Sequence, residues 1–244
     1  MSKILLVGDT HGSYNELYLI YKTAQKNEVE AIVQLGDFGF GWDIHNKTNQ
    51  CNWSRVISTQ YYQKYKIPLY WIDGNHENFD RLEKIPLDEN GYREIFPGVI
   101  HLSRGSKIKF GETTFLALGG AYSVDKNGRK IGKSWWEQET ITDEDVDRAI
   151  KAGPADILLT HDIPFGVEEE ESLIDHISHY GQHAIIGSQA NERRVSQVLE
   201  SCGARKVFHG HLHRRYAKVM DSGVMVVGLN CQDTGGENLL VIDC

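Results

Sequence analysis

The sequence predicts an α/β protein in which two mixed β-sheets pack face to face and helices flank them. Two observations carry this prediction. Short apolar runs alternate with segments of helical spacing in the first third of the chain, and further short apolar runs separated by turns follow in the middle and at the end. The chain has 244 residues, 40% of them hydrophobic, which is enough for a sizeable core in a single domain covering residues 1–244.

The first third alternates buried strands with amphipathic helices, which predicts parallel pairing of the strands. Each predicted strand is a short apolar run that leads directly into polar residues. The first predicted helix places Leu17, Ile20 and Ala24 on one face. The predicted elements, in order, are strand 4–7, helix 15–26, strand 31–35, helix 55–65 and strand 68–72.

The sequence after residue 72 predicts a series of short strands and two further helices. Gly111 and Glu112 separate two apolar runs, which is a hairpin signal. Thr142 followed by Asp145 is a weak capping box that starts a helix. The predicted strands are 99–102, 107–110, 113–118, 157–159, 206–208, 216–220, 224–227 and 239–242, and a further helix covers 191–199.

The longest stretch without a predicted element is 165–187, which contains four consecutive acids and three histidines. A loop of this length inside a domain is typically a functional lid or insertion, or else a solvated surface excursion. We therefore expect either a lid at this position or an exposed loop without a role in the site.

Charge and cysteine usage exclude several classes of protein. The net charge is −8 without any basic run, so broad binding to a nucleic-acid backbone or to an anionic membrane is not expected. No window approaches the roughly 20 apolar residues of a membrane span, and the N-terminal apolar run is too short for a signal peptide. The four cysteines are scattered, which favours reduced thiols in a cytoplasmic protein over a disulfide pair.

Acid, amide and imidazole side chains follow five of the predicted apolar strands. Binding sites of α/β sheets form beyond the carboxyl ends of strands, so these side chains are expected to meet in one place. Glycines stand next to most of them and allow the tight turns that this requires. The seven candidate metal ligands are Asp9, His11, Asp37, Asn75, His161, His211 and His213.

The types of candidate ligand indicate the class of metal. Two carboxylates, one amide and four imidazoles without a thiolate suit Mn, Fe, Co, Ni or Zn better than Mg, which prefers oxygen ligands. Seven ligands are too many for one catalytic ion with an open position, but they suit two ions that share a carboxylate. A single histidine is more often a hydrogen-bonded core residue. The agreement of five strand ends argues against that interpretation for the whole set.

The motifs resemble those of the calcineurin-like metallophosphoesterase superfamily, in the order of that family and over most of the chain. This family has a four-layer sandwich fold, which agrees with the elements predicted above. The matching segments are Gly8-Asp9-Thr10-His11-Gly12, Gly36-Asp37, Gly74-Asn75-His76-Glu77, Thr160-His161 and Gly210-His211-Leu212-His213.

The resemblance implies two divalent metal ions, with manganese expected first, and the hydrolysis of a small phosphoester substrate. It implies that a hydroxide between the two ions attacks phosphorus, and that His76 is the proton donor to the leaving oxygen. By resemblance the first ion is held by Asp9, His11 and His213, the second by Asn75, His161 and His211, and Asp37 bridges them.

The sequence departs from the Ser/Thr protein phosphatases of the same superfamily. Those enzymes carry arginines after the second motif and before Gly-Asn-His-Glu, where this chain has Phe38-Gly39-Phe40-Gly41-Trp42 and Ile72-Asp73. A phosphodiester has one negative charge fewer than a monoester and needs less such help, so the sequence favours a phosphodiesterase. A phosphomonoesterase or protein phosphatase is the alternative. A further alternative is a non-catalytic interaction scaffold. The presence of all seven candidate ligands and His76 argues against it.

Several residues near the predicted site have two interpretations. Aromatic side chains could stack on a nucleobase or fill the core, and Glu77 could orient a ligand or be solvated. The histidines of the long loop, His176, His179 and His183, either reach the site or lie on the surface. The aromatic residues are Phe38, Phe40, Trp42, Tyr122, Trp135 and Trp136.

Overall fold

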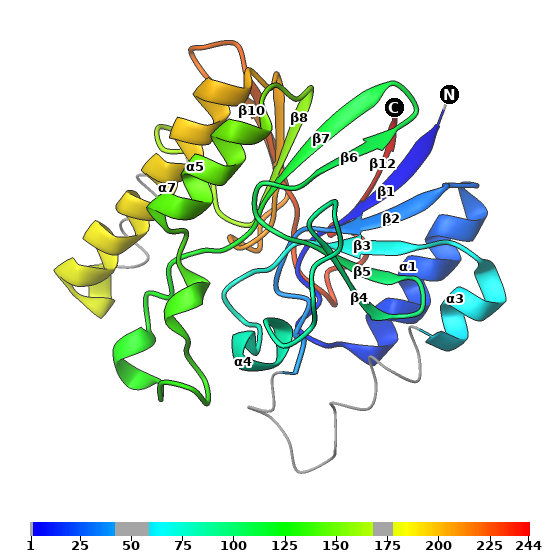
Figure 1. The fold of residues 1–244 in the computed structure, drawn as a ribbon, viewed down its shortest axis with the longest axis horizontal. Coiled ribbons are helices and arrows are strands. Elements are labelled where there is room, and N and C mark those ends of the chain that lie inside the picture. The colour runs from blue at the N-terminus through cyan, green and yellow to red at the C-terminus, as the bar shows by residue number, and fades with distance from the viewer. Residues whose placement is uncertain (1, 42–58, 168–177) are drawn as a thin grey trace.

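The computed structural model describes residues 2–41, 59–167 and 178–244. These residues form two six-stranded mixed sheets that pack face to face. Helices cover the outer face of each sheet, so the molecule has four layers (Figure 1). The predicted fold class is therefore confirmed.

The first sheet contains all three strands predicted from the first third of the sequence. Neighbouring strands run parallel from β1 to β2, β3 and β5, whereas β12 and β4 join the two edges antiparallel. The carboxyl ends of β1, β2 and β3 therefore meet at one edge. In sheet order the strands are β12 (Leu239–Asp243), β1 (Lys3–Val7), β2 (Ala31–Gln34), β3 (Leu69–Trp71), β5 (Val99–Leu102) and β4 (Tyr92–Phe96).

The second sheet is assembled from the middle and the C-terminal part of the chain. Its central strands β7, β8, β9 and β11 are parallel, and β6 and β10 form antiparallel edges. In sheet order the strands are β10 (Tyr216–Val219), β11 (Met225–Gly228), β9 (Lys206–His209), β8 (Ile157–Thr160), β7 (Thr113–Leu118) and β6 (Lys107–Phe110).

The central strands are apolar throughout because both of their faces are buried. In β1, Ile4 and Leu6 belong to the core between the two sheets, whereas Leu5 and Val7 belong to the core beneath the helices. This alternation follows from the two-residue period of a strand. A third core lies between the second sheet and its helices.

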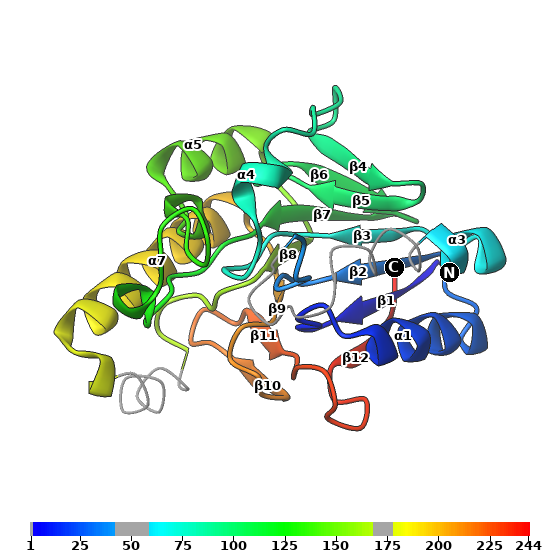
Figure 2. The ribbon, with the colours of Figure 1, turned by 90° about the horizontal axis from the view of Figure 1, so that it is seen from below.

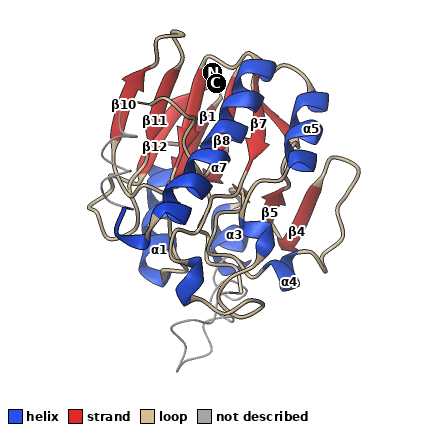
Figure 3. Ribbon diagram, turned by 90° about the vertical axis from the view of Figure 1, so that its left-hand side faces the viewer, coloured by secondary structure: helices blue, strands red, loops and turns tan. Residues whose placement is uncertain are grey.

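The helices form the outer layers. In Figure 2 α1 lies along β1, and in Figure 3 α5 and α7 lie in front of β7 and β8. Thr142 and Asp145 form the predicted capping box at the start of α5. The four longer helices are α1 (Tyr14–Lys26), α3 (Thr59–Tyr65), α5 (Asp143–Ala152) and α7 (Gln182–Cys202), and the short ones are α4 (Phe79–Leu82), η2 (Lys126–Gly128), η3 (Glu137–Glu139) and η4 (Ser178–Tyr180).

The start of α7 and the strand β4 differ from the sequence-based prediction, which also did not include the short helices α4, η2, η3 and η4. Helix α7 begins at Gln182, nine residues before the predicted start at Asn191, so 182–187 is helical and not part of a loop. Gly187 weakens the helical signal there, yet the helix needs a glycine because a Cβ would lie 2.1 Å from the Tyr122 ring. Strand β4 was missed, although the turn at Pro97-Gly98 between two apolar runs is a signal for it.

The lid interpretation of 165–187 stays a prediction, since 168–177, with the four acids and His176, lies outside the described residues. Cys202, Cys231 and Cys244 are free thiols, and Cys51 also lies outside that part. Within the described ranges, no helix is both long and apolar enough to span a membrane.

A buried ion-pair network ties the first sheet to α5. The guanidinium of Arg104 contacts Asp73 Oδ2 at 2.6 Å and Asp145 Oδ2 at 2.8 Å, and it donates to the Thr140 carbonyl at 3.0 Å. Burial opposes ionisation of Asp73, but the charge of Arg104 holds its pKa well below the usual range. Because Asp73 directly precedes Gly74 and Asn75, this network positions the third predicted motif.

Arg104→Met is expected to lower the free energy of unfolding by about 3–5 kcal/mol, because it leaves the buried Asp73 carboxylate without its guanidinium partner. Urea unfolding followed by circular dichroism measures the change. The control is Arg148→Met. The Arg148 side chain is 57% exposed and also pairs with Asp145, so its loss should cost less than about 1 kcal/mol. Equal losses for the two variants would contradict a special role for the buried network.

Candidate metal centre

The predicted ligands converge on the buried carboxylate of Asp37, which follows β2. His11 Nε2 lies 3.2 Å from Asp37 Oδ2, and His161 Nε2 lies 3.3 Å from Asp37 Oδ1. His76 approaches the same carboxylate, with its backbone N–H donating to Oδ1 at 2.9 Å and its Nε2 at 3.8 Å from Oδ2. The carboxylate therefore stands between side chains from three different strand ends.

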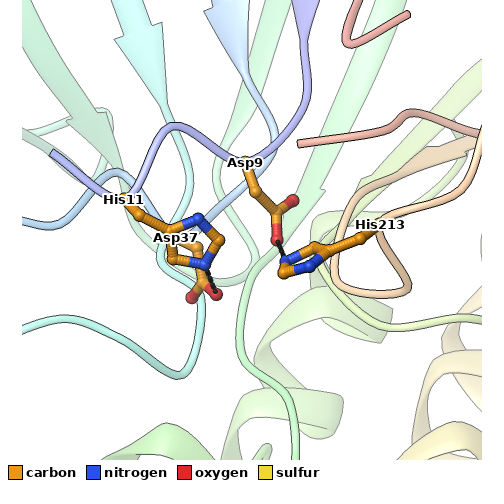
Figure 4. A group of neighbouring side chains, drawn as sticks. All are labelled: Asp9, His11, Asp37 and His213. Carbon is orange, nitrogen blue, oxygen red and sulfur yellow. Dashed lines mark hydrogen bonds and ion pairs between the residues drawn. The ribbon is translucent and has the colours of Figure 1, made fainter. Parts of the chain in front are cut away.

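Four of the seven predicted ligands form one compact group. Each offers one ligand atom, and these atoms all lie within 4.8 Å of one another. The side chains point toward a common space from the ends of β1, β2 and β9 (Figure 4), and His213 Nε2 lies 3.0 Å from Asp9 Oδ2. This is the group that the resemblance assigns to the first ion together with the bridge: Asp9, His11, Asp37 and His213.

The other three predicted ligands lie beside this group. Asn75 Oδ1 is 3.2 Å from His161 Nε2, and the His161 and His211 ring centroids are 5.0 Å apart. Asn75 Nδ2 donates to Ser123 Oγ at 3.0 Å, so the amide oxygen is the atom that faces the cluster. The structure thus brings all seven residues to one place. Their assignment as metal ligands stays a prediction.

Hydrogen bonds hold the imidazoles in orientations that suit metal binding. His161 Nδ1 lies 2.7 Å from the carbonyl of Leu35 and can only donate to it, so loss of a proton from the ring leaves the lone pair on Nε2, toward Asp37. His11 Nδ1 lies 2.8 Å from Gln232 Oε1 in the same way. A partner behind the ring that fixes the tautomer is typical of metal-binding histidines.

The backbone at the site is unusual for residues with a side chain. Among the described residues, seven besides glycine have a positive φ, and four of these seven are predicted ligands. Such conformations cost roughly 1–3 kcal/mol each and are concentrated at functional sites. The four are His11 (φ 42°), Asp37 (52°), His211 (64°) and His213 (51°).

Two of the neighbouring glycines are needed for close approach. A Cβ at Gly210 would lie 2.1 Å from Asp9 Oδ1, and a Cβ at Gly36 would lie 2.3 Å from His161 Nδ1. Any larger residue would push the predicted ligands apart. Gly36 also has a φ of 93°, so it serves both the turn and the contact.

Glu77 has a role that neither sequence interpretation anticipated. It is buried, and its carboxylate accepts the backbone N–H groups of Phe38 at 2.7 Å and of Phe40 at 2.6 Å. Burial raises the pKa of Glu77 well above its usual range. The side chain therefore holds the loop that follows Asp37, and it is neither solvated nor bonded to a predicted ligand's side chain.

The electrostatics of the cluster favour positive charge. Burial opposes protonation of His11, but Asp37 and Asp9 raise its pKa to about 9. The same two carboxylates overcome burial and raise the pKa of His161 to about 10. Protons on these imidazoles balance the two buried acids, and a bound cation would take over that task. Together with the imidazole-rich donor set, this shows that the residues fit divalent metal ions.

The structure decides most of the remaining sequence interpretations. Phe38, Phe40 and Trp136 are buried and belong to the core around Trp71, so base stacking was the wrong interpretation for them. Tyr122 is buried against α7 at Gly187. Trp42 lies outside the described residues.

The structure also places Trp135 and two of the histidines of segment 165–187. His183 Nε2 contacts Asn127 Nδ2 at 3.0 Å, and His179 is exposed beside Tyr180. Trp135 is partly exposed and lies next to the ammonium group of Lys126, 5.5 Å from its ring centroid. Neither histidine is placed in the cluster by these contacts.

Arg129 is a site residue that the sequence analysis missed. Its terminal nitrogens lie 3.4 Å from both ring nitrogens of His76, and its side chain is 12% exposed. Arg129 belongs to none of the five motifs and lies more than 50 residues from His76 in the chain, so no spacing pattern points to it. The local excess of basic residues after Asp125 was the one available signal.

Comparisons with known proteins agree with this arrangement. The chain is 24% identical over 232 residues to the lariat debranching enzyme of Schizosaccharomyces pombe, which covers 87% of this chain and 48% of that protein. The chain thus spans about half the length of this curated relative.

Solved structures share the fold. The protein TT1561 of Thermus thermophilus superimposes with a TM-score of 0.59 at 12% identity, covering 99% of this chain and 98% of that one. A dimetal phosphatase from Danio rerio gives a TM-score of 0.56 at 14% identity, with 94% and 87% covered.

The family model of the calcineurin-like phosphoesterases matches residues 2–215. This range includes all five motifs and all seven predicted ligands, together with His76 and Arg129. The chain belongs to the calcineurin-like phosphoesterase family.

Proposed function

We propose that this protein hydrolyses phosphodiesters with the help of two divalent metal ions. The observation that supports it best is the environment of Asp37, a buried carboxylate with three imidazole Nε2 atoms within 3.8 Å. A carboxylate placed between two sets of imidazole and oxygen donors is suited to a ligand shared by two cations. Family membership and the compact group of four ligand atoms support the same function.

In this proposal each half of the cluster holds one ion, and manganese is proposed first because the donor set is rich in imidazole. Iron, cobalt, nickel and zinc suit the same set. When bound, two such ions supply positive charge for phosphoryl oxygens and make a water acidic enough to lose a proton near neutral pH. One half is Asp9, His11 and His213, the other is Asn75, His161 and His211, and Asp37 belongs to both.

His76 is the group proposed to serve the leaving oxygen. Its side chain is 17% exposed and lies between Asp37 and Arg129. Burial lowers the pKa of His76, Asp37 opposes this and Arg129 adds to the lowering, so the pKa lies at about 3. A phosphoester bound at Asp37 would add negative charge beside the ring, which favours the protonated imidazole, and this form can donate a proton to the departing oxygen.

The preference for diesters rests on the charge around the site. Where protein phosphatases have arginines, this chain has the segments Phe38-Gly39-Phe40-Gly41-Trp42 and Ile72-Asp73. The carboxylate of the buried Asp73 is bound to Arg104. Arg129 brings a cation to His76 but comes paired with Asp125 at 2.8 Å. Within residues 2–41, 59–167 and 178–244, the site therefore lacks the pair of unbalanced arginines that a dianionic monoester would favour. Similarity to an enzyme named for debranching lariats supports a nucleotide-type substrate.

The test is metal removal and reconstitution with matched substrates. Chelation should abolish hydrolysis of bis(4-nitrophenyl) phosphate, and Mn, Co or Ni should restore it better than Mg. The value of kcat/KM should be higher for this diester than for 4-nitrophenyl phosphate. Full activity after verified metal removal would contradict metal dependence, and a preference for the monoester would contradict the diester assignment. Two bound ions without turnover of any ester would favour an interaction scaffold.

A further inference from the structure

The segment between β7 and η3 forms the side of the site next to His76. Residues 122–136, here called the basic segment, contain four basic residues against the single acid Asp125, a formal charge of +3. The whole chain has a net charge of −8. Ser123 at the start of the segment bonds to Asn75, and Arg129 in its middle contacts His76. The positive charge is thus local and adjacent to the candidate metal centre.

Arg129 is held firmly along one edge of its guanidinium. Its Nε donates to Asp125 Oδ2 at 2.9 Å, and its Nη2 lies 2.8 Å from Asp125 Oδ1. This two-point contact between residues four apart sets the direction of the side chain. The planar group is therefore preorganised, so little side-chain entropy is lost when it binds a ligand.

The other edge of the guanidinium makes longer contacts. Nη1 lies 3.4 Å from His76 Nδ1, 3.4 Å from Ser123 Oγ and 3.5 Å from the carbonyl of Ser134. It also lies 3.8 Å from Oε2 of the buried Glu139. Bonds of roughly 2.7–2.9 Å are usual between a cationic donor and an anionic oxygen. An anionic oxygen reaching Nη1 would replace long contacts with a short, charge-assisted one.

We propose that Arg129 is a specificity-determining residue that binds a second phosphate, carried by the leaving group of the substrate. The inference rests on the phosphodiesterase function proposed above and names its substrate class. A phosphoryl group held at Asp37 directs its leaving oxygen to His76, so the atoms attached to that oxygen come next to Arg129. The lysines of the basic segment add to the attraction between Arg129 and a phosphate carried by the leaving group.

The proposal distinguishes between substrates on which the five motifs would act in the same way. An oligonucleotide end or another diester whose leaving nucleoside carries a phosphate meets Arg129 with an anion. A 2′,3′-cyclic phosphate presents only a hydroxyl in that position. The guanidinium, with its planar fork of donors, suits a phosphate better than a neutral group.

Three dinucleotides test the inference: adenylyl-adenosine, and the same compound with a terminal phosphate at its 5′ or its 3′ end. Whichever nucleoside leaves, one compound carries the phosphate on it. In the Mn-loaded wild type, that phosphate should raise kcat/KM by about 10-fold to 100-fold, the size of one charge-assisted hydrogen bond. Arg129→Gln should remove this advantage, and Arg129→Lys should keep only a small part of it.

Arg194→Gln is the matched control. It removes the same charge from a side chain that pairs with Asp143 on the surface of α5 and α7, and the terminal-phosphate advantage should survive in it. Metal content and thermal unfolding of each variant show that the cluster and the fold are retained.

Binding of a substrate fragment, which carries both phosphates on the leaving nucleoside, gives a readout independent of turnover. By calorimetry, the Mn-loaded wild type should bind adenosine 3′,5′-bisphosphate about 10-fold more tightly than adenosine 5′-monophosphate, and Arg129→Gln should bind the two equally.

The outcomes distinguish the two proposals. If the wild type cleaves the diesters without any terminal-phosphate advantage, or if Arg129→Gln keeps the advantage or the preference for the bisphosphate, the inference about Arg129 is wrong and the phosphodiesterase function stands. If the wild type cleaves no diester at all, the proposed function fails and the inference fails with it.

Discussion

Asp37→Asn is expected to empty both metal positions at once. It should lower kcat/KM by more than the roughly 10-fold to 100-fold loss that follows when a hydrogen-bond partner of a metal ligand is removed. The substitution keeps the size of the side chain but removes its negative charge. That charge lies within 3.3 Å of both His11 Nε2 and His161 Nε2, which belong to different halves of the cluster. Loss of this one negative charge should therefore weaken metal binding in both halves of the cluster.

Metal stoichiometry by mass spectrometry of the intact protein measures this effect. His213→Ala should chiefly empty the half that contains Asp9, and His161→Ala chiefly the half that contains Asn75. Asp143→Asn is the matched control, since that carboxylate is 83% exposed on α5 and its loss should leave both ions in place. Two tightly bound ions surviving in Asp37→Asn would contradict the bridging role.

His76→Ala is expected to keep both ions and to slow turnover by roughly 10²-fold to 10⁴-fold, the usual size of a general-acid contribution. The side chain follows Asn75, but its ring contacts Arg129 whereas Asn75 contacts His161. Removing the ring therefore takes away a hydrogen donor without removing a predicted ligand. The backbone N–H of this residue, which donates to Asp37, is retained in the variant.

The size of the loss in His76→Ala should depend on the leaving group. A nitrophenolate departs readily without a proton, so bis(4-nitrophenyl) phosphate should be affected least. A ribose alkoxide needs the proton, so a dinucleotide should be affected most. Steady-state kinetics on both substrates measures the difference. An equal loss on both would assign His76 an electrostatic role, and a lost metal ion would place it among the ligands.

The order of strands and helices and the candidate ligands could be predicted because each is signalled by a few consecutive residues. The strands around Ile4, Ile32 and Leu158 are continuous apolar runs, since both faces of each central strand are buried. The turns that follow carry the polar residues, and parallel strands bring such turns to one edge. A strand end needs only a few consecutive residues to be recognised, so sequence by itself determined the fold class and the seven candidates.

Partners that meet through tertiary contacts left no such local signal. Arg104 and Arg129 belong to no motif, and Glu77 belongs to one without a defined role. The roles of all three depend on which distant groups the packing places within hydrogen-bonding distance. Likewise, His209, two residues before His211, faces the Tyr216 hydroxyl at 2.6 Å instead of the cluster.

The same reason applies to helix α7 and to the choice among the aromatic side chains. Gly187 signals a break when read alone, but the ring of Tyr122 packs against the helix there. Phe38 and Phe40 follow the second motif directly, yet Glu77 holds their backbone so that both rings enter the core around Trp71. The tertiary structure decided these positions because burial and pairing are properties of residues distant in sequence, which periodicity and spacing do not encode.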